Sequence, residues 1–156
     1  MFHNSFAFPA RIKPDRAGRF FVSFPDLPDA LTDGATRAEA LEQASDALGT
    51  ALAERVRRNE AIPAPRARAA GLVLVRPSAY VVAKVALNLV FRDGDVPAAE
   101  LARRLRCDTK EVWRILNPAH PTKLPRIEQA LAALGHHLEV AVKPDRPKAA
   151  EPRVAA

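Results

Sequence analysis

The sequence predicts an α+β domain over residues 1–77, an all-α domain over residues 78–142 and a disordered tail over residues 143–156. Two observations support this fold class. Early in the chain apolar residues alternate with other residues and then recur at helical spacing, the pattern of a sheet packed on a helix. After residue 78 helical spacing dominates, and turn-forming residues divide it into short segments. The tail is rich in Pro, Ala and charged residues, a composition that does not form a core.

The first strands form a predicted hairpin. Residues 6–12 alternate between apolar and other side chains and are expected to form a strand. Pro9 within this strand indicates a sheet edge or a bulge, because proline has no N–H to donate to a strand ladder. A turn leads to a second strand over residues 19–24. Residues 25–29 contain two prolines and are expected to form a rigid loop, followed by a short third strand over residues 30–33.

A helix and a fourth strand complete the predicted first domain. Thr36 and Glu39 have the spacing of a capping box, in which each side chain bonds a free backbone N–H at the helix start. The helix is expected to continue to about Arg58. Residues 59–68 include an Ile-Pro-Ala-Pro segment that cannot be helical, and the apolar residues 72–75 predict a buried strand. The predicted element order is β-β-β-α-β.

The second domain is predicted to contain four helices and a terminal strand. Ser78 can cap the first helix, and Gly135 occupies the position after the last helix where a left-handed residue is common. The terminal strand has no obvious partner within the chain, so we expect it to pair with its copy in a homodimer or a higher homo-oligomer. The expected helices are residues 79–91, 97–105, 109–117 and 122–134, and the expected strand is residues 136–142.

Residues 98–116 carry the most informative pattern, two short helices joined by a tight turn. Ala102 provides the small residue that two steeply crossing helices need where they approach, and Asp108 can cap the second helix. The turn usually takes Gly in the left-handed region, whereas this chain has Arg106, at a cost of about 1 kcal/mol. The pattern predicts a helix-turn-helix that binds double-stranded DNA; the alternative is a helical hairpin with solvated charges. The expected DNA-contact residues are Thr109, Lys110, Trp113, Arg114 and Lys123.

Several segments, read together, resemble the HicB antitoxin family. In the N-terminal half they are the strand at residues 6–12, GRFFVSFPDLP at residues 18–28, LTDGATRAEAL at residues 31–41 and IPAP at residues 62–65. The C-terminal half resembles the branch of that family that carries a helix-turn-helix of the Cro/repressor type. That resemblance rests on LNPAHPTKL at residues 116–124 and AALG at residues 132–135.

The resemblance implies what each domain does. The N-terminal domain would have a degraded RNase H-like fold that binds and occludes a HicA-type toxin, a small mRNA-cleaving ribonuclease. The pair would repress its own operon, with the helix-turn-helix binding operator DNA as a dimer. Because the toxin of this family is a basic RNA-binding protein, acidic loop residues would complement it. The expected toxin-contact residues are Phe24, Asp26, Leu27 and Asp29.

Other chemistry is not expected. The single cysteine, Cys107, rules out an internal disulfide framework and a Cys-based zinc site. The carboxylates of the first domain fall in turns and loops rather than within strands, so a two-metal nuclease site is not expected. His136 and His137 would point to opposite faces of a strand and would not bind one metal together. We therefore expect no enzyme activity and no cofactor.

Composition also bears on location and partners. The most apolar run, residues 80–91, is too short to span a bilayer and contains Lys84 and Asn88, and the chain starts without a signal peptide. A cytoplasmic protein without a membrane partner is expected. The net charge of +6 favours nucleic acid or an acidic partner. The alternative function is a stand-alone transcription regulator whose first domain senses a ligand or oligomerises.

Overall fold

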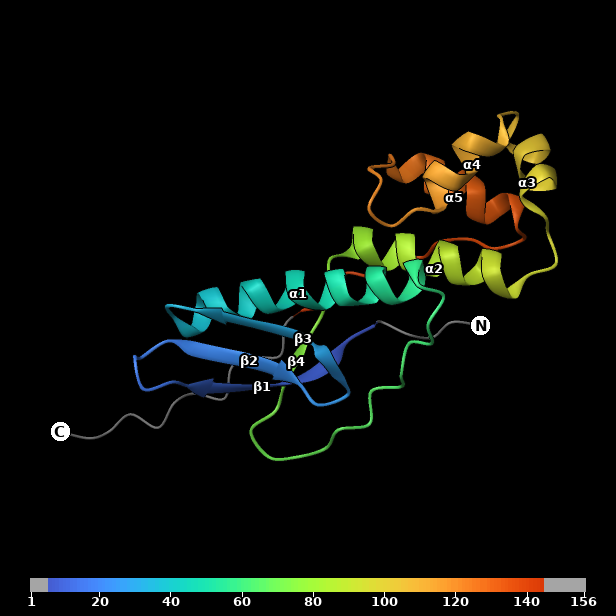
Figure 1. The fold of residues 1–156 in the computed structure, drawn as a ribbon. Helices are drawn as coiled ribbons and strands as arrows, with labels where there is room; N and C mark the ends of the chain where they lie inside the picture. Colours follow the sequence, from blue (N-terminus) through green and yellow to red (C-terminus); the bar gives the residue numbers. More distant parts are fainter. Residues whose placement is uncertain (1–5, 145–156) are drawn as a thin grey trace.

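A computed structural model describes residues 6–144, and the predicted tail lies outside them except for its first two residues. The elements of this part of the chain confirm the α+β class and the β-β-β-α-β order. Helix α1 lies on the sheet, α2 lies against α1, and α3–α5 pack on the far side of α2 (Figure 1). The strands are β1 (Phe8–Pro14), β2 (Phe20–Phe24), β3 (Leu27–Gly34) and β4 (Val73–Val75). The helices are α1 (Arg37–Arg57), α2 (Ala79–Asp93), α3 (Ala98–Leu105), α4 (Thr109–Leu116) and α5 (Leu124–Ala133).

The sheet has the strand order β3-β2-β1-β4, and every neighbouring pair is antiparallel. Strand β3 is longer than predicted, because Leu27 does not lie in a loop but pairs with Phe24 beyond an irregularity in the ladder. Pro28 is compatible with β3 because this is an edge strand, whose outer side needs no backbone donor. Pro9 pairs with Leu74 beyond the part of β1 that pairs with β2. At Pro9, β1 therefore has a ladder partner on one side only, which agrees with the predicted edge position.

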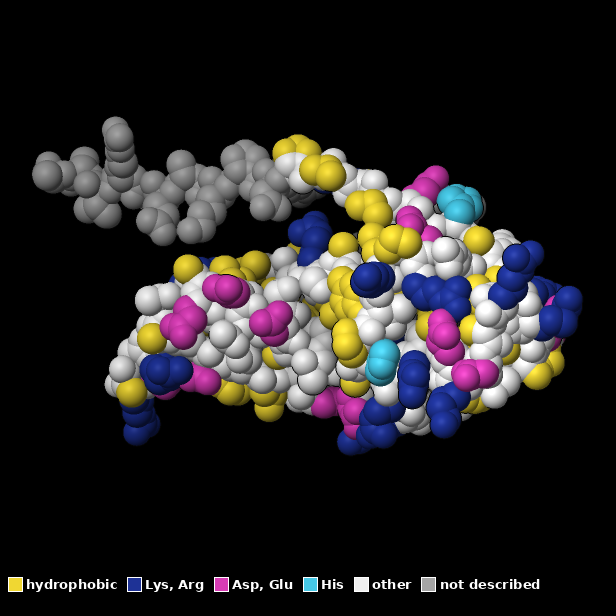
Figure 2. Space-filling view, turned by 90° about the horizontal axis from the view of Figure 1, so that it is seen from above, with side chains coloured by type: hydrophobic (Ala, Val, Ile, Leu, Met, Phe, Trp, Pro, Cys, Tyr) yellow, Lys and Arg dark blue, Asp and Glu magenta, His cyan; other side chains and the backbone are white. Residues whose placement is uncertain are grey.

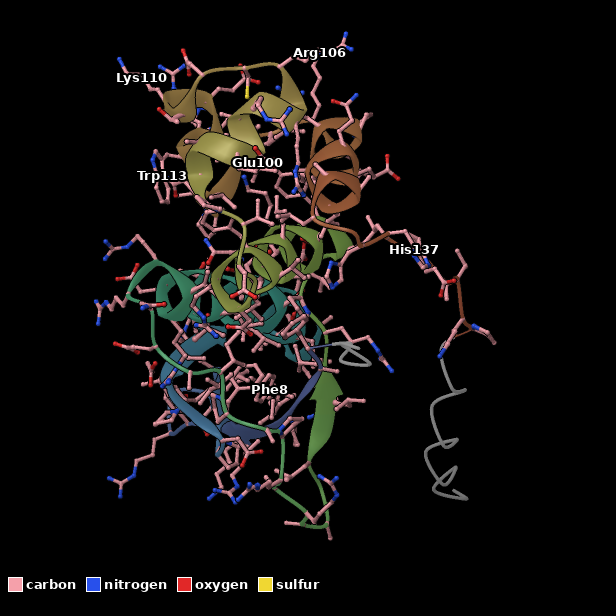
Figure 3. The ribbon with its side chains drawn as sticks, turned by 90° about the vertical axis from the view of Figure 1, so that its right-hand side faces the viewer. Phe8, Glu100, Arg106, Lys110, Trp113 and His137 are labelled. Atoms are coloured by element: carbon pink, nitrogen blue, oxygen red, sulfur yellow. The ribbon has the colours of Figure 1, made fainter. Side chains whose placement is uncertain are left out.

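Helix α1 begins at the predicted capping box. The Thr36 hydroxyl accepts from the N–H of Glu39 at 3.1 Å, and the Glu39 carboxylate accepts from the N–H of Ala35 at 2.8 Å. The apolar side of α1 then packs on the inner face of the sheet, where Phe8 and Leu48 are fully buried. Figure 3 shows Phe8 in the interior of this domain. Local capping and helical spacing thus place α1 as predicted.

Helix α2 belongs to two hydrophobic cores. Val85 and Leu89 pack with the sheet and α1, whereas Ala83 and Leu87 pack with α3–α5. The predicted cap is present, since the Ser78 hydroxyl accepts from a backbone N–H in the first turn at 3.3 Å. The sequence assigned this helix to the second domain alone. In the structure it contributes residues to both cores.

The described part of the C-terminal segment, residues 136–144, forms no strand. The predicted strand over residues 136–142 is therefore absent from the single chain, and its pairing with a second copy stays a prediction. A strand exists only where its backbone joins a ladder with another strand, and the sheet of the described chain ends elsewhere, at β3 and β4. Leu138 packs on the second core, whereas Val140 and Val142 are exposed. Alternation of apolar residues alone did not create a strand here.

Candidate functional site

Helices α3 and α4 meet through a turn with a left-handed residue. Arg106 has φ +52° and ψ +45°. Its N–H donates to the carbonyl of Arg103 at 3.2 Å, and the N–H of Cys107 donates to the carbonyl of Ala102 at 3.0 Å. This pair of bonds is the Schellman motif that often ends a helix, usually with glycine at the left-handed position. The sequence predicted a conformational conflict at Arg106, and the structure confirms it.

The start of α4 is fixed by two contacts. The Asp108 carboxylate caps the helix by accepting from the N–H of Glu111 at 2.7 Å, as predicted. The Glu111 carboxylate in turn accepts from the guanidinium of Arg126 on α5 at 2.6 and 3.0 Å. The N-terminal end of α4 is therefore tied both to its own cap and to the neighbouring helix.

The apolar side of the α3–α4 pair is fully used for packing. Ala102 is buried at the crossing of the two helices, as its small size requires. Cys107 is half-buried, and burial raises the pKa of its thiol, which keeps the thiol protonated and unreactive. The other apolar residues predicted for this contact are all buried: Leu101, Leu105, Val112, Ile115 and Leu116.

The opposite side of α4 is exposed. Its exposed side chains project from one side of a single helix, because they are spaced one turn apart. Figure 3 shows Lys110 and Trp113 on the same outer side of the molecule. Lys123 precedes α5 and is also exposed. We use the name α4 face for the four exposed residues of α4 together with Lys123: Thr109, Lys110, Trp113, Arg114 and Lys123.

The cations of the α4 face are free to bind a partner. Lys110, Arg114 and Lys123 form no ion pair with any residue of the described chain. Arg103 on α3 differs, because its guanidinium is bound to Glu100 of the same helix at 2.7 and 2.8 Å. Figure 2 shows Lys and Arg side chains gathered over α3–α5 and acidic side chains gathered over α1. The uncompensated positive charge of α4 thus lies on its exposed face.

Trp113 combines packing with exposure. Its ring lies 5.9 Å from that of Phe91 on α2, in an edge-to-face arrangement with an interplanar angle of 86°. The Trp113 side chain is nevertheless 57% exposed. The sequence predicted Trp113 as a DNA-contact residue. The structure shows that it packs on Phe91 and keeps most of its surface available.

Sequence reasoning missed the residues that hold the end of α4. The Lys84 ammonium on α2 donates to the carbonyl of Ile115 at 2.5 Å and to the hydroxyl of Thr122 at 3.0 Å. The Asn88 side chain on α2 donates to the carbonyl of Leu116 at 3.0 Å. The last turn of α4 and the segment before α5 are therefore bonded to α2 by side chains as well as by apolar packing.

These groups form a stripe along α2. The Tyr80 hydroxyl accepts from the N–H of Thr122 at 2.8 Å. Tyr80, Lys84 and Asn88 are spaced at four-residue intervals in the otherwise apolar run of residues 80–91, so they lie on one side of α2. This spacing was the available sequence signal. Lys84 is only 1% exposed, and burial lowers its pKa from 10.5 to about 8. We call Tyr80, Lys84 and Asn88 the α2 polar stripe.

Two of the residues proposed for toxin contact are in the first core. Phe24 and Leu27 are 1% and 0% exposed, respectively. Their apolar side chains complete the inner face of the sheet under α1. They offer no side-chain surface to a partner in this structure, which corrects their assignment to a contact surface.

The two acidic candidates hold local structure together. The Asp26 carboxylate accepts from the backbone N–H groups of Arg66 and Ala67, both at 2.9 Å, and so fixes the connection between α1 and β4. The Asp29 carboxylate accepts two bonds from one nitrogen of Arg55, at 2.8 and 3.0 Å. Both carboxylates thus shape the domain, whatever else they contact.

Comparison with known proteins identifies the family. Residues 7–86 match the model described as the HicB_like antitoxin of bacterial toxin-antitoxin system. The chain is 40% identical over 136 residues to Antitoxin HicB 1 of Photorhabdus laumondii, covering 87% of this chain and 86% of that protein. This chain belongs to the HicB antitoxin family. It is also 37% identical over 133 residues to Antitoxin HicB of Escherichia coli K12, covering 85% and 96% of the two chains.

The similarity to HicB proteins includes the C-terminal helices. The family model ends within α2 at residue 86. An alignment that covers 133 of the 156 residues cannot avoid α3 and α4, wherever it starts. The α4 face and the α2 polar stripe therefore lie within the region shared with these HicB relatives.

Two further findings on the described part of this HicB-family chain concern groups of metal-binding side chains and helices that could span a membrane. Within residues 6–144 no group of three or more His, Cys, Asp or Glu side chains could hold a metal ion. None of the helices in that range has the length and hydropathy needed to cross a membrane.

Proposed function

We propose that this HicB-family chain is an antitoxin that neutralises a HicA-type mRNA-cleaving toxin and represses its own operon by binding operator DNA as a dimer. Family membership supports the antitoxin half of the proposal. The observation that carries the DNA-binding half is the α4 face, where free cations and an exposed indole lie on one side of a short helix after a tight turn.

Helix α4 has the features of a helix that enters the major groove. The second helix of a helix-turn-helix places its N-terminal residues against base edges, while adjacent cations bind phosphates. Thr109 and Lys110 are the first two residues of α4, and Arg114 follows one turn later. A guanidinium at that position can bind guanine or phosphate through two parallel bonds. Free cations on this face, in contrast to the paired Arg103, fit binding to a polyanion.

The N-terminal domain is the proposed toxin-binding unit, with a degraded RNase H-like arrangement of its β-β-β-α-β elements. With Phe24 and Leu27 buried, the proposed contact surface comprises Asp26, Asp29 and acidic side chains of α1. Glu42 on α1 is exposed, and Figure 2 shows several acidic side chains over this helix. A basic toxin would be steered to this surface by charge complementarity.

The segment after α5 is proposed to pair with its copy across a two-fold axis. Val140 and Val142 are 68% and 98% exposed, so the segment has apolar surface and backbone groups to share. Such a dimer could place two α4 helices about one DNA turn, roughly 34 Å, apart. A chain truncated after Gly135 should be monomeric by light scattering and should lose operator affinity. A truncated chain that remains dimeric would refute the pairing.

The DNA-binding half is tested by substituting the free cations. The double variant Lys110→Ala with Arg114→Ala should bind operator duplex more weakly, with a salt slope smaller by about 2, because two phosphate or base contacts are lost. Toxin neutralisation in a growth assay should be unchanged. Arg103→Ala is the matched control, because it removes an exposed arginine that Glu100 already neutralises. Equal losses in the control and the double variant would argue against the α4 face.

The alternative function is a stand-alone helix-turn-helix regulator with a sensing or oligomerising first domain. Family membership favours the antitoxin. Co-expression with the neighbouring gene decides between them, since an antitoxin should rescue growth and co-purify with the small protein encoded there. Operator binding without growth rescue or co-purification would favour the stand-alone regulator.

A further inference from the structure

Lys84 of the α2 polar stripe is buried without a carboxylate partner in the described chain. It forms no ion pair with any residue of the described chain, and its partners are two neutral oxygen atoms, on Ile115 and Thr122. Removing an ammonium group from water costs free energy that neutral acceptors only partly return, and the lowered pKa reflects this cost. Methionine would fill a similar volume without the cost. Net stability alone therefore does not account for a lysine at this position.

Two of the four hydrogen bonds of the stripe reach the end of α4, and the other two reach Thr122 before α5. The last carbonyl groups of a helix have no partner within the helix and carry its negative dipole end. Lys84 and Asn88 satisfy two of these carbonyls, those of Ile115 and Leu116. Hydrogen bonds are directional, whereas apolar contacts tolerate sliding and rotation. The stripe therefore fixes the rotation and the axial position of α4 on α2.

Helix α2 is a suitable reference for this positioning. Val85 and Leu89 anchor it in the first core, and Leu87 anchors it in the second. Lys84 follows Ala83 of the second core and precedes Val85 of the first, so its side chain starts from a backbone that both cores hold in place. The orientation of α4 is thereby set relative to the whole molecule.

We propose that Lys84, assisted by Asn88 and Tyr80, is a positioning residue that sets the orientation of the α4 face for operator binding. This inference rests on the proposed DNA-binding function. Without the ammonium group α4 can turn or shift on α2, and Lys110 and Arg114 no longer meet their groups on DNA together. Lys84 is buried and does not contact DNA itself.

The test compares three substitutions of lysine by methionine in the full chain. Lys84→Met removes the buried ammonium, Lys110→Met removes an exposed cation of the α4 face, and Lys13→Met is a control at an exposed site on β1. The probe is a fluorescein-labelled duplex covering the promoter of the chain's own operon. Anisotropy titrations at several salt concentrations give the affinity and the salt slope of each variant.

The two binding variants should differ in kind. Lys84→Met should weaken binding roughly tenfold without changing the salt slope, because no phosphate contact is removed. Lys110→Met should reduce the slope by about 1. Lys13→Met should bind like the wild type. Lys84→Met should also keep toxin neutralisation. At pH 7 its unfolding temperature should stay close to that of the wild type, because the lost hydrogen bonds and the removed cost of burying a charge oppose each other.

Trp113 gives a readout without DNA. It is the only tryptophan of the chain, and it packs on Phe91 of α2. If α4 moves on α2, the emission maximum and acrylamide quenching of this indole should change in Lys84→Met and stay unchanged in Lys13→Met. A purely structural loss would instead lower the unfolding temperature.

Each outcome bears on the proposal. If Lys84→Met binds operator with wild-type affinity and its Trp113 emission is unchanged, the positioning role of Lys84 is refuted. The DNA-binding function is not affected by that result. If the wild-type chain binds no operator duplex, the DNA-binding function fails and this proposal fails with it. If Lys84→Met does not fold, Asn88→Ala replaces it, because Asn88 is half-buried and donates to the same end of α4. Wild-type affinity in Asn88→Ala then overturns the proposal.

Discussion

Replacing Arg106 by glycine should stabilise the protein. Arg106 ends α3 with φ +52°, in the left-handed region where a Cβ atom is crowded by the backbone. Its exposed side chain forms no hydrogen bond or ion pair with residues of the described chain, so glycine removes no contact there. The bonds from Arg106 and Cys107 that close the helix are made by backbone N–H groups and are retained. The change in stability on substitution therefore reports the cost of the left-handed backbone conformation and not the loss of a side-chain contact.

The magnitude follows from two opposing effects. Relief of the left-handed conformation is worth about 1–2 kcal/mol. Glycine also gains conformational freedom in the unfolded chain, which costs about 0.4–1 kcal/mol. The net gain in the free energy of unfolding should be about 1 kcal/mol, equivalent to a rise of roughly 2–4 °C in the unfolding temperature for a chain of this size. Calorimetry and urea titration of Arg106→Gly measure both quantities.

Two other helix ends supply matched controls. Asn59 and Gly135 also have positive φ, +59° and +78°, and both occupy the same position in a Schellman motif. Asn59→Gly should gain less than Arg106→Gly, because asparagine tolerates this region better. Gly135→Ala should lose about 1 kcal/mol from the backbone alone, since a Cβ added there meets no atom within 4 Å. No gain in Arg106→Gly, with the expected loss in Gly135→Ala, would falsify the assignment of strain to Arg106.

Two further predictions concern pH and the long connection. Burial lowers the pKa of Lys84 from 10.5 to about 8, so the unfolded chain binds this proton more tightly than the folded chain does. The free energy of unfolding should therefore rise between pH 8 and pH 10.5, by up to about 3 kcal/mol. Urea titrations of Lys84→Met should lack this rise, and an equal rise would contradict the assignment. Asp26→Ala should lower the free energy of unfolding by about 2 kcal/mol and speed tryptic cleavage after Arg66, because the N–H groups of Arg66 and Ala67 lose their acceptor. Asp26→Asn keeps an acceptor oxygen and should lower the free energy of unfolding less.

The sequence was most accurate where a local rule decides the structure. The capping box at Thr36, the cap at Asp108 and the left-handed turn at Arg106 each depend on residues within one or two turns of the chain. The exposure of Lys110 and Arg114 also follows from helical spacing alone. Four of the five predicted DNA-contact residues therefore lie on one side of a short helix, because they all belong to α4.

The sequence was least accurate where a distant segment decides. Leu27 lies in a strand because Phe24 and its neighbours offer a ladder, and its burial follows from α1 covering that face. The alternating residues before Val142 form no strand because the chain offers them no partner. Strand pairing and burial depend on the segment that packs opposite a residue, and a local sequence pattern does not identify that segment.

The sequence by itself determined the α+β class, the helix ends and the free cations of α4, and its segments indicated the HicB family. Only the tertiary structure decided that α2 serves both cores and that Lys84 holds the end of α4. The reason is physical. Caps and helical faces are properties of neighbours in the chain, whereas the environment of a buried lysine is created by a segment about thirty residues away, whose position only folding establishes.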